Sequence, residues 1–144
     1  MEQKLLILPR YSKLGASSRY RFYDYIEHLD KKGFECITSP LFSDKYLKKT
    51  YSKSFRVLEV IKCYWKRFLV LFNLKKYDSC LVEKELLPFL PYFIESLFLS
   101  SCNNYDIDYD DAIFHRYDDH NSTIIRSLFS KKIAKLMRNA ECVT

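Results

Sequence analysis

The sequence predicts an α/β protein with a doubly wound, mostly parallel sheet of about five strands and helices on both faces. Short apolar runs, typical of buried parallel strands, alternate with longer segments of helical periodicity. The chain has 144 residues, of which 48% are hydrophobic, so it has room for one domain with a packed core. We therefore expect residues 1–144 to form a single domain.

The first part of the chain predicts two strands joined by a helix. Residues 5–8 and residues 34–38 are short apolar runs, and each is followed closely by proline. Between them, residues 19–32 carry apolar side chains at the three- and four-residue spacing of one helix face. Gly33 is a suitable residue to end that helix. Together these elements form a βαβ unit, whose crossover we expect to be right-handed.

The remainder continues the alternation of helices and strands. In doubly wound sheets, ligands bind where the strands end, near the point at which the strand order reverses. Three segments that follow predicted strands are therefore the candidates for chemistry: residues 10–18, 83–87 and 108–120. The further elements are helices at residues 54–74, 92–99 and 121–139 and strands at residues 77–82, 105–109 and 141–144.

Small and hydroxylated residues follow the first predicted strand at the start of a helix. Backbone N–H groups at such a position favour anions, and Arg19 and Arg21 add positive charge. Two interpretations stay open: a loop that contacts phosphate, or an ordinary turn with a serine N-cap and two solvated arginines. The spacing matches neither the dinucleotide-binding nor the Walker A motif. The substrate-binding candidates here are Gly15, Ala16, Ser17, Ser18 and Arg19, with Ser17 or Ser18 as the N-cap.

Acidic residues follow the fourth predicted strand. Asp108 and Asp110 are two positions apart, which places them on one face of a strand. Their carboxylates suit a cation, a substrate hydroxyl or the capping of a turn, and we favour hydrogen bonding over metal binding. Asp111 and His115 come next; a histidine here is a candidate for proton transfer, with polar packing as the alternative.

Charged residues also follow the third predicted strand. Glu83 and Glu85 flank Lys84 at the same edge of the sheet, and Arg116 lies beyond the fourth strand. We consider Glu83, Glu85 and Arg116 as substrate-binding residues. The alternative for residues 83–85 is a charged turn exposed to solvent.

The cysteines and the apolar segments bear on location. The five cysteines contain no CxxC pair, so we interpret them as free thiols in a reducing cytosol rather than as zinc ligands. The N-terminus has no signal-peptide pattern, and residues 86–99 are too short and too interrupted to span a membrane. We expect a cytoplasmic protein.

Positive charge is concentrated in residues 53–76, which hold seven Lys/Arg and one Glu. Such a basic, aromatic helix favours peripheral contact with the anionic inner face of the plasma membrane. A nucleic acid is a poorer partner, because no helix-turn-helix, zinc or RNP signature is present. The alternative is a helix that covers the core and whose lysines are solvated. The candidate membrane contacts are Lys62, Trp65, Lys66 and Arg67, and the expected core side is Val57, Ile61, Tyr64 or Trp65, Phe68 and Phe72.

Three stretches, taken in order, resemble the N-terminal half of the retaining glycosyltransferases of family 4, which build bacterial surface polysaccharides. The resemblance covers nearly the whole chain, and its first and third stretches are more specific than the second. The stretches are residues 5–11 (LLILPRY) with 15–19 (GASSR), residues 39–42 (SPLF) with 46–47 (YL), and residues 83–88 (EKELLP) with 110–115 (DDAIFH).

This resemblance implies the GT-B fold, in which two Rossmann-like domains enclose a cleft. The N-terminal domain holds the acceptor, a second domain binds the nucleotide sugar, and neither metal nor cofactor is needed. Residues 15–18 would approach the donor phosphate, with Arg19 supporting their loop. Asp110, Asp111 and His115 would line the cleft as catalytic candidates. In the mechanism proposed for the family, the leaving phosphate helps to deprotonate the acceptor, so no side-chain nucleophile is required.

The chain departs from the family in length, since the family continues beyond the position of Thr144 into the donor-binding domain. The resemblance implies that this chain alone does not transfer sugar. A truncated product, one half of a split enzyme and a remnant all stay open. We expect as partners an acceptor glycan or lipid-linked glycan and a separate donor-binding domain. The alternative function is a non-catalytic module that binds a membrane or a partner through residues 53–76.

Overall fold

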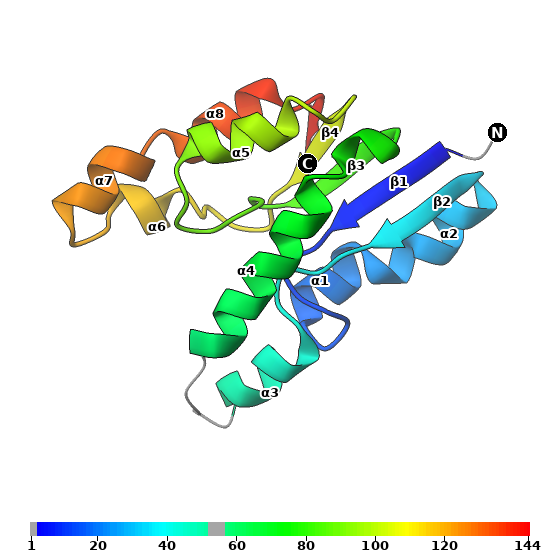
Figure 1. The fold of residues 1–144 in the computed structure, drawn as a ribbon, viewed down its shortest axis with the longest axis horizontal. Coiled ribbons are helices and arrows are strands. Elements are labelled where there is room, and N and C mark those ends of the chain that lie inside the picture. Colours follow the sequence, from blue (N-terminus) through cyan, green and yellow to red (C-terminus); the bar gives the residue numbers. More distant parts are fainter. Residues whose placement is uncertain (1–2, 52–56) are drawn as a thin grey trace.

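The computed structural model describes residues 3–51 and 57–144 (Figure 1). At its centre is a five-stranded sheet in which all paired strands are parallel. The strand order is β2-β1-β3-β4-β5, so the α/β, doubly wound class is confirmed. The strands are β1 (Gln3–Leu8), β2 (Phe34–Thr38), β3 (Ser79–Glu83), β4 (Tyr105–Asp108) and β5 (Cys142–Val143).

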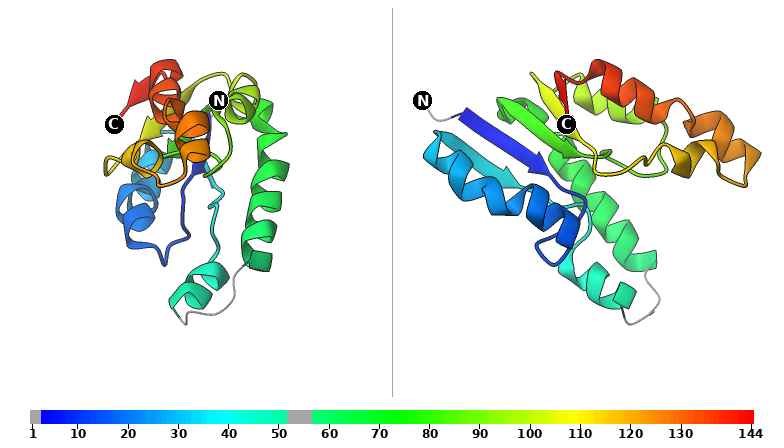
Figure 2. Two further views of the ribbon diagram at one scale, coloured as in Figure 1. Left: turned by 90° about the vertical axis from the view of Figure 1, so that its left-hand side faces the viewer. Right: turned by 180° about the vertical axis from the view of Figure 1, so that it is seen from behind.

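Helices cover both faces of this sheet. Figure 2 shows α1 and α2 on one side of β1 and β2, with α4 on the other side. A short helix, α3, precedes α4 and was not expected from the sequence. The helices are α1 (Ala16–Arg21), α2 (Ile26–Lys31), α3 (Asp44–Tyr51), α4 (Val57–Leu71), α5 (Tyr92–Leu99), α6 (His115–Asp118), α7 (Thr123–Phe129) and α8 (Lys132–Asn139).

The alternation of side chains along β1 explains the two core layers. Leu6 and Leu8 point to the main core, which α4, α5 and α8 cover. Leu5 and Ile7 point to the opposite face, where Phe22 and the residues of α2 pack. All four leucine and isoleucine side chains are buried, as expected for a strand in the interior of a parallel sheet.

The first predicted helix, residues 19–32, is divided in the structure. It consists of α1, a 3-10 turn at Tyr23–Tyr25, and α2. The break falls at Phe22, whose backbone leaves the helical region (φ −128°, ψ −59°) while its side chain is buried. Gly33 ends α2 with a φ of +92°, which confirms its predicted role at the end of the helix.

The predicted helix of residues 121–139 is also two helices, α7 and α8. The backbone of Lys131 is non-helical at the junction (φ −91°, ψ 3°). The junction allows Lys132 to turn fully inward, where it is 1% exposed and ion-paired with buried carboxylates. A buried charge pair therefore overrides the helical propensity of this stretch.

Helix α4 is oriented differently from the expectation. Its buried positions are Glu59, Cys63, Arg67 and Leu71, spaced four residues apart. The expectation that Val57, Ile61 and Phe72 face the core is wrong, since these side chains are exposed. Residues 53–56 of the predicted basic helix lie outside the described residues.

The described residues include no helix that is both long enough and apolar enough to cross a bilayer. The five cysteines are free thiols, with Cys63 and Cys80 buried and Cys142 exposed.

Candidate ligand site at the carboxyl edge of the sheet

Three loops meet where the strands end. The chain leaves β1 for β2 on one side and returns to β3 on the other side of β1, so the strand order reverses between β1 and β3. This reversal is the place where doubly wound folds bind ligands. The loops that follow β1, β3 and β4 carry the residues singled out from the sequence.

The loop after β1 folds tightly against itself. Gly15 is buried, and a Cβ at this position would collide with the Cβ of Tyr11, so glycine is required. The hydroxyl of Ser18 accepts a hydrogen bond from the N–H of Tyr11 (3.0 Å) and donates one to Oε2 of Glu83 (2.6 Å). Gly15 is the N-cap of α1, so the prediction of a serine N-cap is wrong.

The loop after β3 is buried rather than solvated. Glu83, Lys84 and Glu85 are 1%, 8% and 4% exposed, which contradicts the interpretation as an exposed turn. Oε2 of Glu83 accepts a hydrogen bond from the backbone N–H of Arg10 (2.7 Å). Lys84 has a φ of +66°, a strained conformation for a lysine, which is typical of functional sites. The glutamates therefore hold the loops together instead of facing solvent.

Glu85 is the centre of a buried charge network. Its Oε2 lies 2.7 Å from Nζ of Lys132 and accepts a hydrogen bond from the hydroxyl of Tyr117 (2.7 Å). Its Oε1 lies 3.2 Å from Nη1 of Arg116 and 3.6 Å from Nη1 of Arg10. Arg116, considered as a substrate-binding residue, thus supports Glu85 in this structure.

Two members of the network were missed in the sequence. Glu95 in α5 and Lys132 in α8 are both fully buried, with Oε1 of Glu95 2.7 Å from Nζ of Lys132. Burial raises the pKa of Glu95 to about 7, against the opposing effect of Lys132. The available signal was a charged residue within each apolar segment: Glu95 interrupts residues 92–99, and Lys132 precedes Ile133.

The acidic residues after β4 contact the other two loops. Asp110 accepts a hydrogen bond from the hydroxyl of Ser17 (2.6 Å) and lies 2.5 Å from Nζ of Lys84. Burial opposes ionisation of Asp110, but the hydrogen bonds from Lys84 and Ser17 keep its pKa below the ordinary value. Asp111 is 3.2 Å from Nζ of Lys84, and its side chain is 62% exposed. Asp108 is paired with Arg21 of α1.

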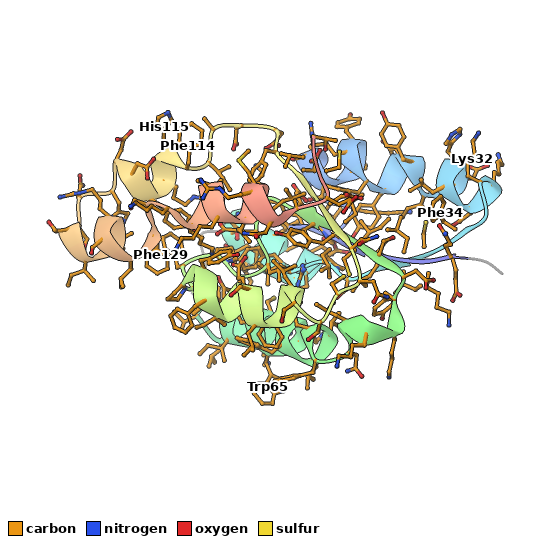
Figure 3. The ribbon with its side chains drawn as sticks, turned by 90° about the horizontal axis from the view of Figure 1, so that it is seen from above. Lys32, Phe34, Trp65, Phe114, His115 and Phe129 are labelled. Carbon is orange, nitrogen blue, oxygen red and sulfur yellow. The ribbon has the colours of Figure 1, made fainter. Side chains whose placement is uncertain are left out.

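Other candidates lie further from this cluster. His115 begins α6, where its Nδ1 is 3.3 Å from Asp119 and its ring lies against Phe114. Figure 3 shows His115 and Phe114 near the outer surface. Arg19 lies over the ring of Tyr20, with 4.8 Å between the guanidinium carbon and the ring centre, and Ala16 is exposed. The structure therefore brings Ser17 together with Asp110 and Asp111, but not with His115.

The chemistry of the edge suits a hydroxylated ligand. Ser17, Lys84, Asp110 and Asp111 offer both donors and acceptors, and Lys84 balances one of the two carboxylates. In residues 3–51 and 57–144 no group of three or more His, Cys, Asp or Glu side chains is arranged to hold a metal ion.

The outer side of α4 forms a second surface, which we call the α4 apolar face. Its large hydrophobic side chains are each between 52% and 73% exposed. Figure 3 shows Trp65 pointing away from the sheet. Lys62 and Lys66 are exposed on the same helix. The face consists of Leu58, Ile61, Trp65, Leu69 and Phe72.

Arg67 is not part of this surface, so its assignment as a membrane contact is corrected. It is 2% exposed, and its Nη2 donates to the backbone oxygen of Pro9 (2.9 Å), fastening α4 to the end of β1. Its Nε and Nη1 have no hydrogen-bond partner among the described residues. Burial lowers the pKa of Arg67 to about 10.

Comparisons with protein-family models, with curated proteins and with solved structures found no match. The functional proposals below therefore depend on the geometry of these two surfaces and on the sequence resemblance described above.

Proposed function

We propose that the chain is the acceptor-side domain of a retaining glycosyltransferase that acts in bacterial surface polysaccharide synthesis. The acceptor, a lipid-linked or polysaccharide glycan, would bind at the carboxyl edge of the sheet. The observation that supports this most is the convergence of Ser17, Lys84, Asp110 and Asp111 at the reversal of strand order. All four residues belong to the first and third stretches that resemble the family. Their arrangement in space is an observation separate from that resemblance.

The edge suggests different roles for its two aspartates. Asp110 stays ionised because Lys84 and Ser17 hold its pKa low, so it is a weak proton acceptor. We assign it the positioning of the Ser17 and Lys84 side chains. Asp111 is exposed and held by Lys84 alone among its described ion pairs, so its carboxylate can accept hydrogen bonds from sugar hydroxyls. This division agrees with a mechanism in which the donor phosphate, rather than a side chain, takes the proton.

Binding of an acceptor tests the proposal. The probes are monosaccharides joined through diphosphate to a ten-carbon prenyl chain, titrated into the protein in a calorimeter. Because hydrogen bonds to a charged group contribute about 1.5–3 kcal/mol, Asp111→Ala should weaken binding by about tenfold or more. Asp118→Ala, an exposed aspartate of α6, is the matched control. Failure of every probe to bind, or equal binding by both variants, would contradict the proposal.

In the proposed enzyme the nucleotide sugar is bound by a separate donor-binding domain, which is then a partner of this chain. UDP- and GDP-sugars should give no heat of binding with the chain alone. Micromolar affinity for either would overturn the assignment of this domain to the acceptor side.

A second candidate function is peripheral attachment to an anionic membrane surface. The specific observation in its favour is the α4 apolar face, bordered by Lys62 and Lys66. Monomeric proteins rarely leave a contiguous row of large hydrophobic side chains in water. The two functions are compatible, since a lipid-linked acceptor is itself held at a membrane.

Vesicle co-sedimentation tests this attachment. Vesicles of phosphatidylcholine that contain about 30% phosphatidylglycerol should bind the chain more strongly than vesicles of phosphatidylcholine alone. Lys62→Glu with Lys66→Glu should abolish the difference, while Lys131→Glu, just before α8, with Lys135→Glu in α8 serves as the control. Binding that the α4 substitutions leave unchanged would refute attachment through α4.

A further inference from the structure

A groove runs along α4 on the side that faces the end of β2. Its volume is about 980 Å³, and its opposite wall is formed by residues 38–43, which lead from β2 toward α3. The same loop contacts the candidate site, because the backbone N–H of Ser12 donates to the oxygen of Phe42 (3.1 Å). The groove therefore lies beside the loop that follows β1.

The interior of the groove is mostly apolar. Leu41 and Cys63 are buried in it, at 2% and 5% exposure. Ile61, Trp65 and Leu69, which belong to the α4 apolar face, also line it, so groove and face form one continuous hydrophobic surface. Contact between water and such a surface is unfavourable, so a hydrocarbon chain that covers the surface lowers the free energy.

The rim of the groove carries positive charge. Lys45 is balanced by Glu59, with 3.6 Å between Nζ and Oε1. Lys62 and Lys66 also border the groove, and no described carboxylate lies within ion-pair distance of either. They are four residues apart in α4, so their side chains are neighbours on the helix surface. A phosphate group between them would satisfy both.

We propose that this groove binds one molecule of an anionic lipid, with the phosphate between Lys62 and Lys66 and the hydrocarbon chain along Leu41, Leu69 and Val70. An apolar floor bordered by two lysines that form no ion pair within the described residues is complementary to an amphiphile that has one negative end. The membrane is the source of this lipid, so the inference extends the membrane-contact proposal. It differs from that proposal in requiring a defined site that binds single molecules in the absence of a bilayer.

A series of alkyl phosphates below their micelle concentrations tests the site. Trp65 lines the groove and is the only tryptophan, so its fluorescence reports occupancy directly. The affinity should rise about fourfold for each added methylene between butyl and octyl phosphate. Inorganic phosphate and octanol provide the charge and the chain separately, and each should bind far more weakly than octyl phosphate.

Matched variants locate the binding. Val70→Phe and Ser39→Phe narrow the groove from opposite walls and should each abolish the response to octyl phosphate. Phe72→Ser changes the α4 apolar face away from the groove lining and should leave it intact. Lys62→Gln and Lys66→Gln should each weaken octyl phosphate binding about fivefold. Circular dichroism and thermal unfolding establish that each variant is folded, and two narrowing variants are included so that one misfolded protein does not decide the result.

The outcomes separate this proposal from the others. Affinity that rises with chain length and is lost in both narrowing variants supports the groove. Equal affinity for octanol and octyl phosphate, no dependence on chain length, or full binding by the narrowing variants would overturn it. Vesicle binding without any octyl phosphate binding would also overturn the groove, while leaving peripheral membrane contact and the acceptor site standing.

Discussion

Helices α4 and α8 cover the same face of the sheet but present opposite surfaces to the outside. Helix α8 buries Lys132, Ile133 and Leu136 and exposes Lys135 and Arg138. Helix α4 buries Glu59 and Arg67 beside Cys63 and Leu71, and it exposes the α4 apolar face. Both helices contribute to the main core, so they differ in their outer sides and in how well their buried charges are paired.

This difference indicates that α8 completes its packing within the chain, whereas α4 does not. A buried arginine whose Nε and Nη1 have no partner among the described residues is costly, and so is a row of exposed large hydrophobic side chains. Both features are present in α4. A membrane or lipid that covers the outer side of α4 would offset the second of these costs.

The largest expected effect is on folding stability. Ile133→Ala removes a fully buried side chain from α8 and should lower the free energy of unfolding by about 2–5 kcal/mol. Ile61→Ala, the same change on the exposed side of α4, should alter it by less than about 0.5 kcal/mol. Urea unfolding measures both. Comparable losses would show that Ile61 packs inside the fold and would break the distinction between the helices.

Vesicle binding should show the reverse pattern. Replacing Ile61, Trp65 and Phe72 together by Gln should weaken binding to phosphatidylglycerol vesicles about a thousandfold or more, since each such side chain gains of order 1.5–3 kcal/mol on full burial. Replacing Ala134, Lys135 and Asn139 of α8 by Gln is the control and should have little effect. Equal effects in the two helices would contradict a specific role for α4. The measurement is co-sedimentation over a range of lipid concentrations.

Adjacent cations of α4 should behave differently. Lys66→Gln should weaken vesicle binding about fivefold, because a lysine near an anionic surface contributes about 1 kcal/mol. Arg67→Met should leave vesicle binding unchanged and alter the free energy of unfolding by no more than about 1 kcal/mol, since an apolar side chain of similar size replaces a poorly satisfied buried charge. Weaker vesicle binding by a folded Arg67→Met protein would restore Arg67 as a membrane contact.

A further effect concerns pH. The pKa of Glu95 rises from 4.5 to about 7 on burial, so between these values the folded chain keeps a proton that the unfolded chain has released. The free energy of unfolding should therefore fall as the pH increases across this range. Glu95→Gln should flatten this dependence. Urea unfolding at several pH values from 5 to about 8 measures the slope, and identical slopes for both proteins would exclude Glu95 as its cause.

The sequence predicted the strands better than the helices. Apolar runs such as residues 5–8 identify buried strands because only the interior of a parallel sheet excludes water from both faces. The helices were harder because polar side chains form part of the core. Lys132 divides one predicted helix, and Arg67 reverses the expected orientation of another. Periodicity assigns such residues to the solvent, whereas their partners, Glu85 and the oxygen of Pro9, are distant in sequence.

The candidate site shows the same limit. Strand ends placed Ser17, Asp110 and Asp111 at one edge, and the structure brings them together around Lys84. The inward direction of Glu85 was not predictable, because it depends on the left-handed backbone of Lys84. Local sequence therefore locates the edge of the sheet but does not distinguish the side chains that face a ligand from those that support them.

The central claim is that an acceptor glycan binds at the carboxyl edge between β1 and β3. The most direct test is a titration of the ¹⁵N-labelled chain with prenyl-diphosphate-linked monosaccharides, followed by NMR amide shifts. The account predicts the largest shifts in residues 10–18, 83–88 and 108–116, and their loss in the Asp111→Ala protein. Shifts confined to α4, or the absence of shifts at the edge under saturating acceptor, would contradict it.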